Sequence, residues 1–154
     1  MRPLRELNFL SFRFHGGKIK VSEASLAEFK YQLKELSSRN WSVSMKYRLY
    51  RIRQYIKGWM GYFGLSEVYS VWLSIDTWLR RRIRMCYWRM WKNAKRRYLN
   101  LRKLGAKHKE AGGFARSSKG YWRVAKHLGY KAGMTNEWLA DEGLIEIKPS
   151  SSSH

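Results

Sequence analysis

The sequence is poor in cysteine, and its few histidines are poorly spaced for binding a metal. It contains one cysteine, Cys86, so no internal disulfide can form and no cysteine pair can contribute to a zinc site. Its four histidines lack the HxxxH or HExxH spacing of metal ligands on a helix. We therefore expect no bound metal and no cofactor. The lone thiol favours a reducing, cytoplasmic setting.

Long apolar runs are also missing. No stretch approaches the roughly 20 apolar residues of a membrane-spanning helix, and the first residues lack the apolar run of a signal peptide. Basic amphipathic helices also bind anionic lipid, which leaves a membrane-surface role as an alternative. The apolar positions, however, recur as seams that pack helices together, so we expect no membrane association.

Groups suited to catalysis are sparse. Asp76 is the only acid between Glu67 and Glu110, so no local pair of carboxylates is available for acid–base or two-metal chemistry. The sequence has neither a Gly-x-Ser-x-Gly turn nor a glycine-rich phosphate loop. We therefore expect no catalytic residues, and no enzyme activity from this chain alone.

Positive charge is what the sequence has in excess. Thirty-two Lys and Arg against eleven Asp and Glu give a net charge of +21. Eighteen of the basic residues lie between Thr77 and Gly133, where Glu110 is the only acid. A folded domain with such a field is stabilised by a polyanion, and the phosphate backbone of a nucleic acid is one. The composition therefore indicates a nucleic-acid-binding protein.

The apolar pattern predicts a mainly α-helical fold that begins with a β-hairpin. Short apolar–polar alternation on both sides of His15-Gly16-Gly17 predicts the hairpin. Apolar residues at helical spacing predict a first helix over about 23–37, with a capping box formed by Ser25 and Glu28. The same spacing predicts a second helix from Ser44 to about Tyr62.

A third helix is predicted from about Val71 to Met90, and the pattern allows it either to continue or to break near Asn93. The periodicity is lost over residues 106–133, which predicts short helices and turns. Thr135 is expected to cap a last helix that Gly143 closes.

Basic and aromatic residues are interleaved along the third predicted helix and beyond it. Arginine binds phosphate through its planar fork, and an exposed Trp or Tyr can stack on unpaired bases. A solvated helix face normally mixes charge signs and this one does not, so we predict phosphate contacts for the basic residues, whereas most aromatics are expected in the core. The predicted RNA-binding residues are Arg53, Lys57, Arg80, Arg81, Arg82, Arg84, Arg89, Lys92, Lys95, Arg96, Arg97, Lys119 and Arg123, with Trp88 and Tyr121 as candidates for base stacking.

Several strings together carry a family resemblance. They are Phe9–Phe12 (FLSF), Lys20–Ser22 (KVS), Tyr55–Phe63 (YIKGWMGYF), Asp76–Lys92 (DTWLRRRIRMCYWRMWK), Ser117–Arg123 (SSKGYWR) and Thr135–Leu139 (TNEWL). From about Leu7 to Ile147 the sequence resembles the C-terminal part of bacterial group II intron reverse transcriptases: the last palm segment, the thumb helices and the maturase domain, often called domain X. Ser11 stands where that family usually has Gly.

The resemblance implies a protein that binds group II intron RNA and promotes its folding and splicing. It implies an end-of-palm hairpin with thumb-like helices over residues 1–64, a small helical domain similar to domain X over 65–147, and a flexible tail over 148–154. Family members also copy RNA into DNA, but the sequence has no Tyr-Ala-Asp-Asp string, no other palm carboxylates and no HNH nuclease.

Alternatives to a stand-alone maturase stay open. The chain could be the C-terminal subunit of a split reverse transcriptase that grips the template-primer while a separate palm chain supplies catalysis. It could also be a decayed remnant. DNA is an alternative ligand to RNA because phosphate contacts alone do not distinguish the two.

Overall fold

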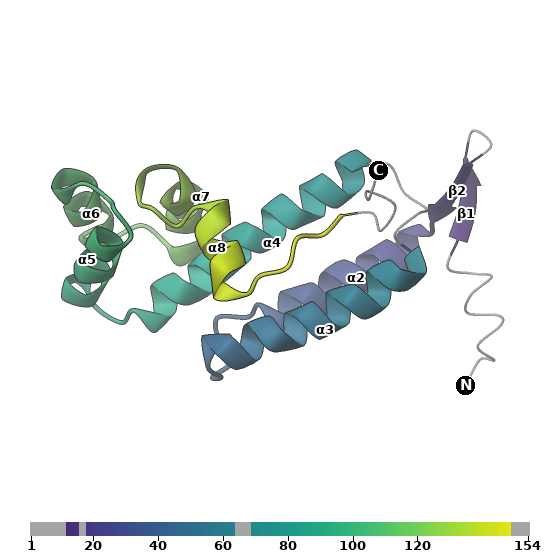
Figure 1. The fold of residues 1–154 in the computed structure, drawn as a ribbon, viewed down its shortest axis with the longest axis horizontal. Coiled ribbons are helices and arrows are strands. Elements are labelled where there is room, and N and C mark those ends of the chain that lie inside the picture. Colours follow the sequence, from purple (N-terminus) through teal and green to yellow (C-terminus); the bar gives the residue numbers. More distant parts are fainter. Residues whose placement is uncertain (1–11, 16–17, 64–68, 149–154) are drawn as a thin grey trace.

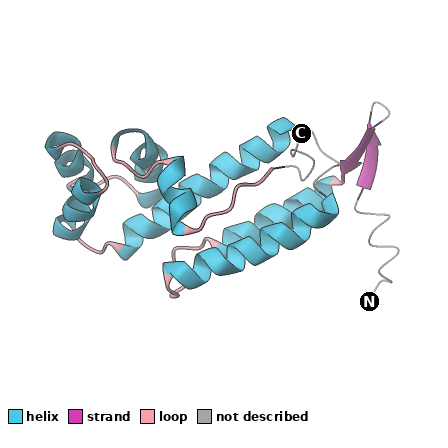
Figure 2. Ribbon diagram, viewed as in Figure 1, coloured by secondary structure: helices cyan, strands magenta, loops and turns pink. Residues whose placement is uncertain are grey.

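The computed structural model describes residues 12–15, 18–63 and 69–148, and over these residues the chain is mainly helical (Figure 1, Figure 2). The predicted turn at Gly16-Gly17, the predicted domain boundary at 64/65 and the tail beyond residue 148 lie outside them. Strands β1 (Phe12–His15) and β2 (Lys18–Val21) pair antiparallel, with Phe12 opposite Val21. The helices that follow are α2 (Glu23–Leu36), α3 (Met45–Phe63), α4 (Tyr69–Met90), α5 (Ala94–Lys103), α6 (His108–Ala115), α7 (Tyr121–Lys131) and α8 (Asn136–Glu142).

Helix α4 connects the two ends of the molecule. At one end it packs with α2 and α3 (Figure 1). At the other end it packs with α7, which in turn contacts α6, and α6 packs against α5. The β1–β2 ribbon and the α5–α6 pair lie at opposite ends of the view. After α8 the chain runs back along α4, and the backbone N–H of Ile147 donates to Asp76 Oδ1 at 3.0 Å.

An aromatic cluster forms the core between α2, α3 and α4. The rings of Phe29 and Trp59 stack with centroids 3.9 Å apart, and Trp72 meets Trp59 edge-on at 5.6 Å. Phe29 and Trp72 are fully buried, as are Leu33, Ile52 and Leu79 around them. Burial of each such side chain stabilises the fold by about 1.5–3 kcal/mol, which explains why helical spacing of apolar residues located these three helices.

The first helix begins where predicted, but a different serine caps it. Ser22, in extended conformation, accepts a hydrogen bond through its side chain from the backbone N–H of Ser25 at 3.1 Å. Ser25 therefore lies inside the first turn, and the predicted capping box of Ser25 and Glu28 is wrong. Ser22 directly follows strand β2 and precedes the first helical residue, which places it at the N-cap.

The third helix breaks rather than continues. Helix α4 ends at Met90, and the Asn93 side chain caps α5 by accepting from the backbone N–H of Arg96 at 2.9 Å. Gly105 follows α5 with φ of +100°, a left-handed conformation that favours glycine. The predicted last helix is confirmed: Thr135 Oγ1 accepts from the N–H of Trp138, and Gly143 closes α8 with φ of +117°.

Helix α7 approaches α4 closely at Gly129. A Cβ atom at this position would lie 2.6 Å from Cζ of Arg84, whose side chain fills the space between the two helices. By contrast, a Cβ at Gly113 in α6 would meet nothing within 4 Å. The two helical glycines thus differ in what surrounds them, although sequence alone treats them alike.

We therefore expect Gly129→Ala to lower the free energy of unfolding by about 1–3 kcal/mol, because the added methyl group displaces the Arg84 guanidinium. Gly113→Ala is the matched control and should raise stability by about 0.5–1 kcal/mol, since alanine is the better helix former. Thermal and urea unfolding followed by circular dichroism measure both. Equal shifts in the two variants would contradict the close packing.

Candidate nucleic-acid interface

Eight of the predicted RNA-binding side chains are exposed. Two lie on α3, three at the junction between α4 and α5 or in the first turn of α5, one at the end of α4, and two at the start of α7. We call these the exposed basic set: Arg53, Lys57, Arg89, Lys92, Lys95, Arg96, Lys119 and Arg123.

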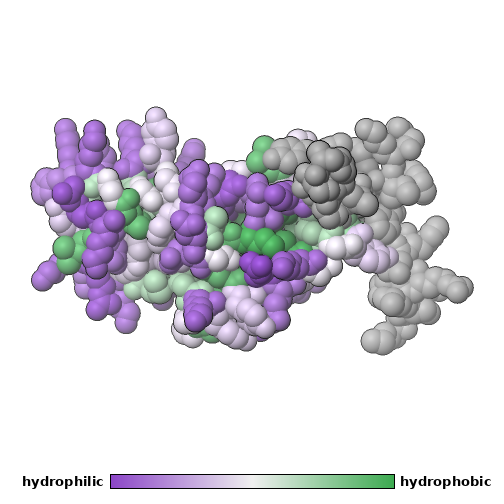
Figure 3. All heavy atoms as spheres, viewed as in Figure 1, coloured by the Kyte–Doolittle hydropathy of each residue, from purple (hydrophilic) through white to green (hydrophobic). Residues whose placement is uncertain are grey.

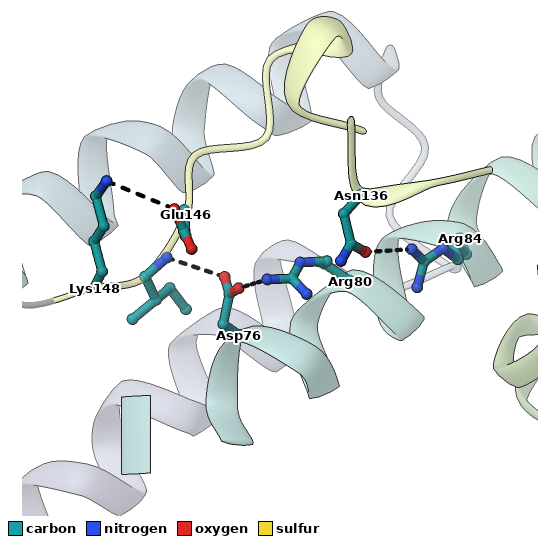
Figure 4. A network of polar contacts seen from close by, with 7 residues as sticks. Asp76, Arg80, Arg84, Asn136, Glu146 and Lys148 are labelled. Carbon is teal, nitrogen blue, oxygen red and sulfur yellow. Dashed lines mark hydrogen bonds and ion pairs between the residues drawn. The ribbon is translucent and has the colours of Figure 1, made fainter. Parts of the chain in front are cut away.

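The Arg80–Arg84 run, predicted to bind RNA, makes internal contacts instead. Arg84 is 9 % exposed; its Nε donates to the carbonyl oxygen of Met134 at 2.7 Å and its Nη2 to Asn136 Oδ1 at 2.8 Å (Figure 4). Burial, with a smaller effect from Arg80, lowers the pKa of Arg84 to about 10, which still leaves it charged at neutral pH. A contact between Arg84 and RNA stays a prediction, and these internal bonds compete with it.

Arg82 holds the C-terminal end of α2. Its Nε donates to Ser37 Oγ at 2.7 Å, and its Nη2 lies 3.3 Å from the carbonyl oxygen of Lys34. Arg48 of α3 reaches the same helix end, where Nη1 donates to the carbonyl oxygen of Leu36 at 2.9 Å. Burial lowers the pKa of Arg82, and the neighbouring positive charges of Arg39 and Arg48 lower it further. A contact between Arg82 and RNA stays a prediction, and these bonds compete with it.

Arg81 and Arg80 also have internal partners. Arg81 donates from Nε and Nη2 to the carbonyl oxygen of Trp122, and its guanidinium lies 3.7 Å from the centroid of the Trp122 ring. Arg80 pairs with Asp76 one turn before it (Figure 4). Burial raises the pKa of Asp76, against the opposing effects of the Ile147 N–H and Arg80. Both arginines are half-buried, and their RNA contacts stay predictions.

Of the two candidates for base stacking, Trp88 is buried. It is 1 % exposed, so its stacking on a base stays a prediction that the burial of the ring opposes. The Arg97 guanidinium lies 4.7 Å from the Trp88 ring, and Arg97 Nε donates to the Trp88 carbonyl oxygen at 3.0 Å. Tyr121 is half-buried, with the guanidinium groups of Arg39 and Arg97 at 5.0 and 5.5 Å from its ring. Stacking of Tyr121 on a base stays a prediction.

Tyr121 marks a point where three segments meet, two of which bring positive charge. Arg39 belongs to the turn after α2, Arg97 to the first half of α5, and Tyr121 opens α7. Sequence reasoning missed Arg39, which lies outside the basic stretch it singled out. It also missed Tyr130, an aromatic residue that is 83 % exposed and borders the basic residue Lys131.

Carboxylates do not balance this charge. Among the described residues, Arg80 is the only basic residue between positions 77 and 133 that forms an ion pair. Hydrophilic side chains accordingly dominate the visible face over α5, α6 and α7 (Figure 3). No three His, Cys, Asp or Glu side chains of the described segments lie close enough to hold a metal ion. Nor is any helix in those segments long and apolar enough to cross a bilayer.

A protein-family model matches residues 26–105, which include most of α2 and the whole of α3, α4 and α5. The model describes the maturase-specific domain of group II introns, and its match covers just over half of the chain. The chain belongs to this family. This membership indicates a group II intron maturase function, in a domain distinct from the polymerase. The maturase match runs across the boundary predicted between residues 64 and 65. A search of curated proteins found no match.

Two arginines of α4 allow the structural role of a buried arginine to be compared with that of an exposed one. Arg84→Gln should lower the free energy of unfolding by about 1–3 kcal/mol, because the buried carbonyl oxygen of Met134 loses its donor. Arg89→Gln, on the same helix but exposed, should change stability by less than about 0.5 kcal/mol. Urea unfolding of both variants checks this. A destabilisation by Arg89→Gln as large as that by Arg84→Gln would contradict the division.

Proposed function

We propose that this maturase domain binds group II intron RNA through the exposed basic set and thereby promotes folding and splicing of the RNA. The observation that carries the proposal is the placement of unpaired basic side chains at helix N-termini. Lys95 and Arg96 lie in the first turn of α5, and Arg123 lies in the first turn of α7. Neither first turn contains an acid.

This placement is unfavourable for an isolated helix. The N-terminal end of a helix has a partial positive charge, so acidic residues stabilise it and basic residues destabilise it by about 0.3–1 kcal/mol each. When a polyanion is bound, the same basic residues become favourable, because the free N–H groups of the helix end and the basic side chains contact the same phosphates. RNA contact is therefore a physical reason to keep basic residues at these positions.

The arginines with internal partners support the proposal by fixing the helices that display the exposed basic set. Arg84 ties α4 to the segment before α8, and Arg81 ties α4 to the start of α7. The exposed charges are thus held in position before RNA binds, and less ordering is needed on binding. Neutralising closely packed phosphates in this way favours a compact intron RNA.

The domain organisation that we propose follows the family resemblance. In this proposal the helices up to residue 64 act like a thumb, and the helices from 65 to 147 act like domain X. The chain contributes binding and no polymerase chemistry. If the chain works with a separate palm chain, the same basic surface binds the RNA on which both chains act.

Loss of three charges from the helix N-termini tests the proposal. We expect Lys95→Gln/Arg96→Gln/Arg123→Gln to weaken binding to a group II intron transcript and to lower the slope of log affinity against log salt by about 2–3. Melting temperature should stay unchanged or rise, since the unfavourable charges at the helix ends are gone. Filter binding across a salt series, with calorimetric unfolding in parallel, gives both quantities.

The matched control removes three exposed lysines outside the set: Lys30→Gln/Lys34→Gln/Lys148→Gln. An equal loss of affinity in this control would show that total charge, and not this surface, governs binding. An unrelated transcript of equal length is the second control. If it binds as tightly as the intron at every salt concentration, the intron-specific part of the proposal fails.

A further inference from the structure

A hollow of about 250 Å³ lies between α6 and α7. Phe114 of α6 and Val124 of α7 provide apolar lining, and Ser117, Lys119, Arg123 and His127 provide polar lining. Val124 is buried and Phe114 half-buried, whereas Lys119, Arg123 and His127 are exposed. The hollow therefore combines an apolar floor with a basic rim.

The polar groups around the hollow have spare hydrogen-bonding capacity. The Ser117 hydroxyl accepts from the backbone N–H of Lys119 at 3.2 Å, and its own proton is available to a ligand. Glu110, half-buried on the same wall, offers carboxylate oxygens as acceptors. No ion pair joins this carboxylate to Lys119 or Arg123 in the described part of the chain. A ligand that fits has a flat apolar body, donor and acceptor groups at its edge, and a negative charge outside.

The size of the hollow narrows the class of ligand. Drug-sized ligands occupy sites of roughly 300–1,000 Å³, so a hollow slightly below this range holds one small ring system. A base inside an A-form helix cannot enter, because its faces are stacked and its edge is paired. Unpaired bases in loops and bulges can be turned outward and packed against aromatic side chains.

We propose that this hollow binds a single unpaired nucleotide of RNA. The base packs against Phe114 and Val124, and Lys119 and Arg123 hold the flanking phosphates. The inference rests on the proposed RNA-binding function and adds a preference for RNA that carries an extruded base. The exposed basic set alone supplies affinity for phosphates without such a preference.

Gly113 makes the inference testable without removing a charge. It lines the hollow, and a Cβ atom added there meets nothing within 4 Å. Gly113→Leu fills the hollow with an apolar side chain, and Gly113→Ala is the matched control that leaves most of the space open. Both substitutions favour the helix, so both variants are expected to fold.

The probes are an RNA hairpin with a fully paired stem and four hairpins that each add one bulged nucleotide, A, C, G or U. We expect the wild-type chain to bind at least one bulged hairpin about fivefold or more tightly than the paired hairpin at the same salt concentration. Gly113→Leu should lose this preference and retain the affinity for the paired hairpin. Gly113→Ala should keep the preference.

The outcomes separate the two proposals. If the paired hairpin binds with the expected salt dependence but no bulge improves binding, or if Gly113→Leu keeps the preference, the nucleotide site is overturned and the RNA-binding function stands. If none of the hairpins binds even at low salt, RNA binding fails and the nucleotide site fails with it. Photo-crosslinking from a bulged 4-thiouridine supports the site when it reaches Phe114 or His127, and crosslinks confined to other helices overturn it.

Discussion

The fold depends on arginine side chains that donate to backbone carbonyl oxygens. With 32 basic and 11 acidic residues, the chain cannot pair most of its basic side chains with carboxylates. The negative end of the α2 dipole substitutes for the missing acids, since Arg48 and Arg82 both donate to carbonyl oxygens near its C-terminal end. Hydrogen bonds from charged donors are stronger than neutral ones, and each buried carbonyl group that they satisfy would otherwise be costly. Hydrogen bonds of this kind join α3 and α4 to the C-terminal end of α2.

Aromatic rings are the second acceptor that the arginines use. The Arg81 guanidinium covers the Trp122 ring at 3.7 Å, and Arg97 lies between the rings of Trp88 and Tyr121. Such contacts contribute about 0.5–2 kcal/mol each, depending on how far they are desolvated. Some of the basic residues in this interleaved pattern, which the sequence analysis assigned to phosphate contacts, thus help to hold α4, α5 and α7 together through the aromatic rings.

The sequence predicted the helices well because apolar spacing reflects burial against neighbours, as at Phe29 and Leu33. The sequence could not separate the exposed basic residues from those with internal partners, because an arginine that donates to a distant carbonyl oxygen has the same sequence context as one exposed to solvent. Arg84 differs from the exposed Arg89 through its hydrogen bonds to Met134 and Asn136, which lie 50 and 52 residues away in the chain. One signal was available: Met85–Trp88 is apolar on every side of the helix, which indicates that α4 is surrounded there and that Trp88 is buried.

Internal acceptors therefore account for part of the positive charge and leave the rest without a structural role. The basic residues at the start of α5 and α7 destabilise the helix ends that carry them, and no described carboxylate pairs with them. Charge left exposed at the least favourable end of a helix is not explained by folding, and it supports the proposed phosphate ligand. The structural arginines hold that charge at fixed positions, so the stability of the fold and the proposed binding of RNA rely on the same residue type but mainly on different side chains.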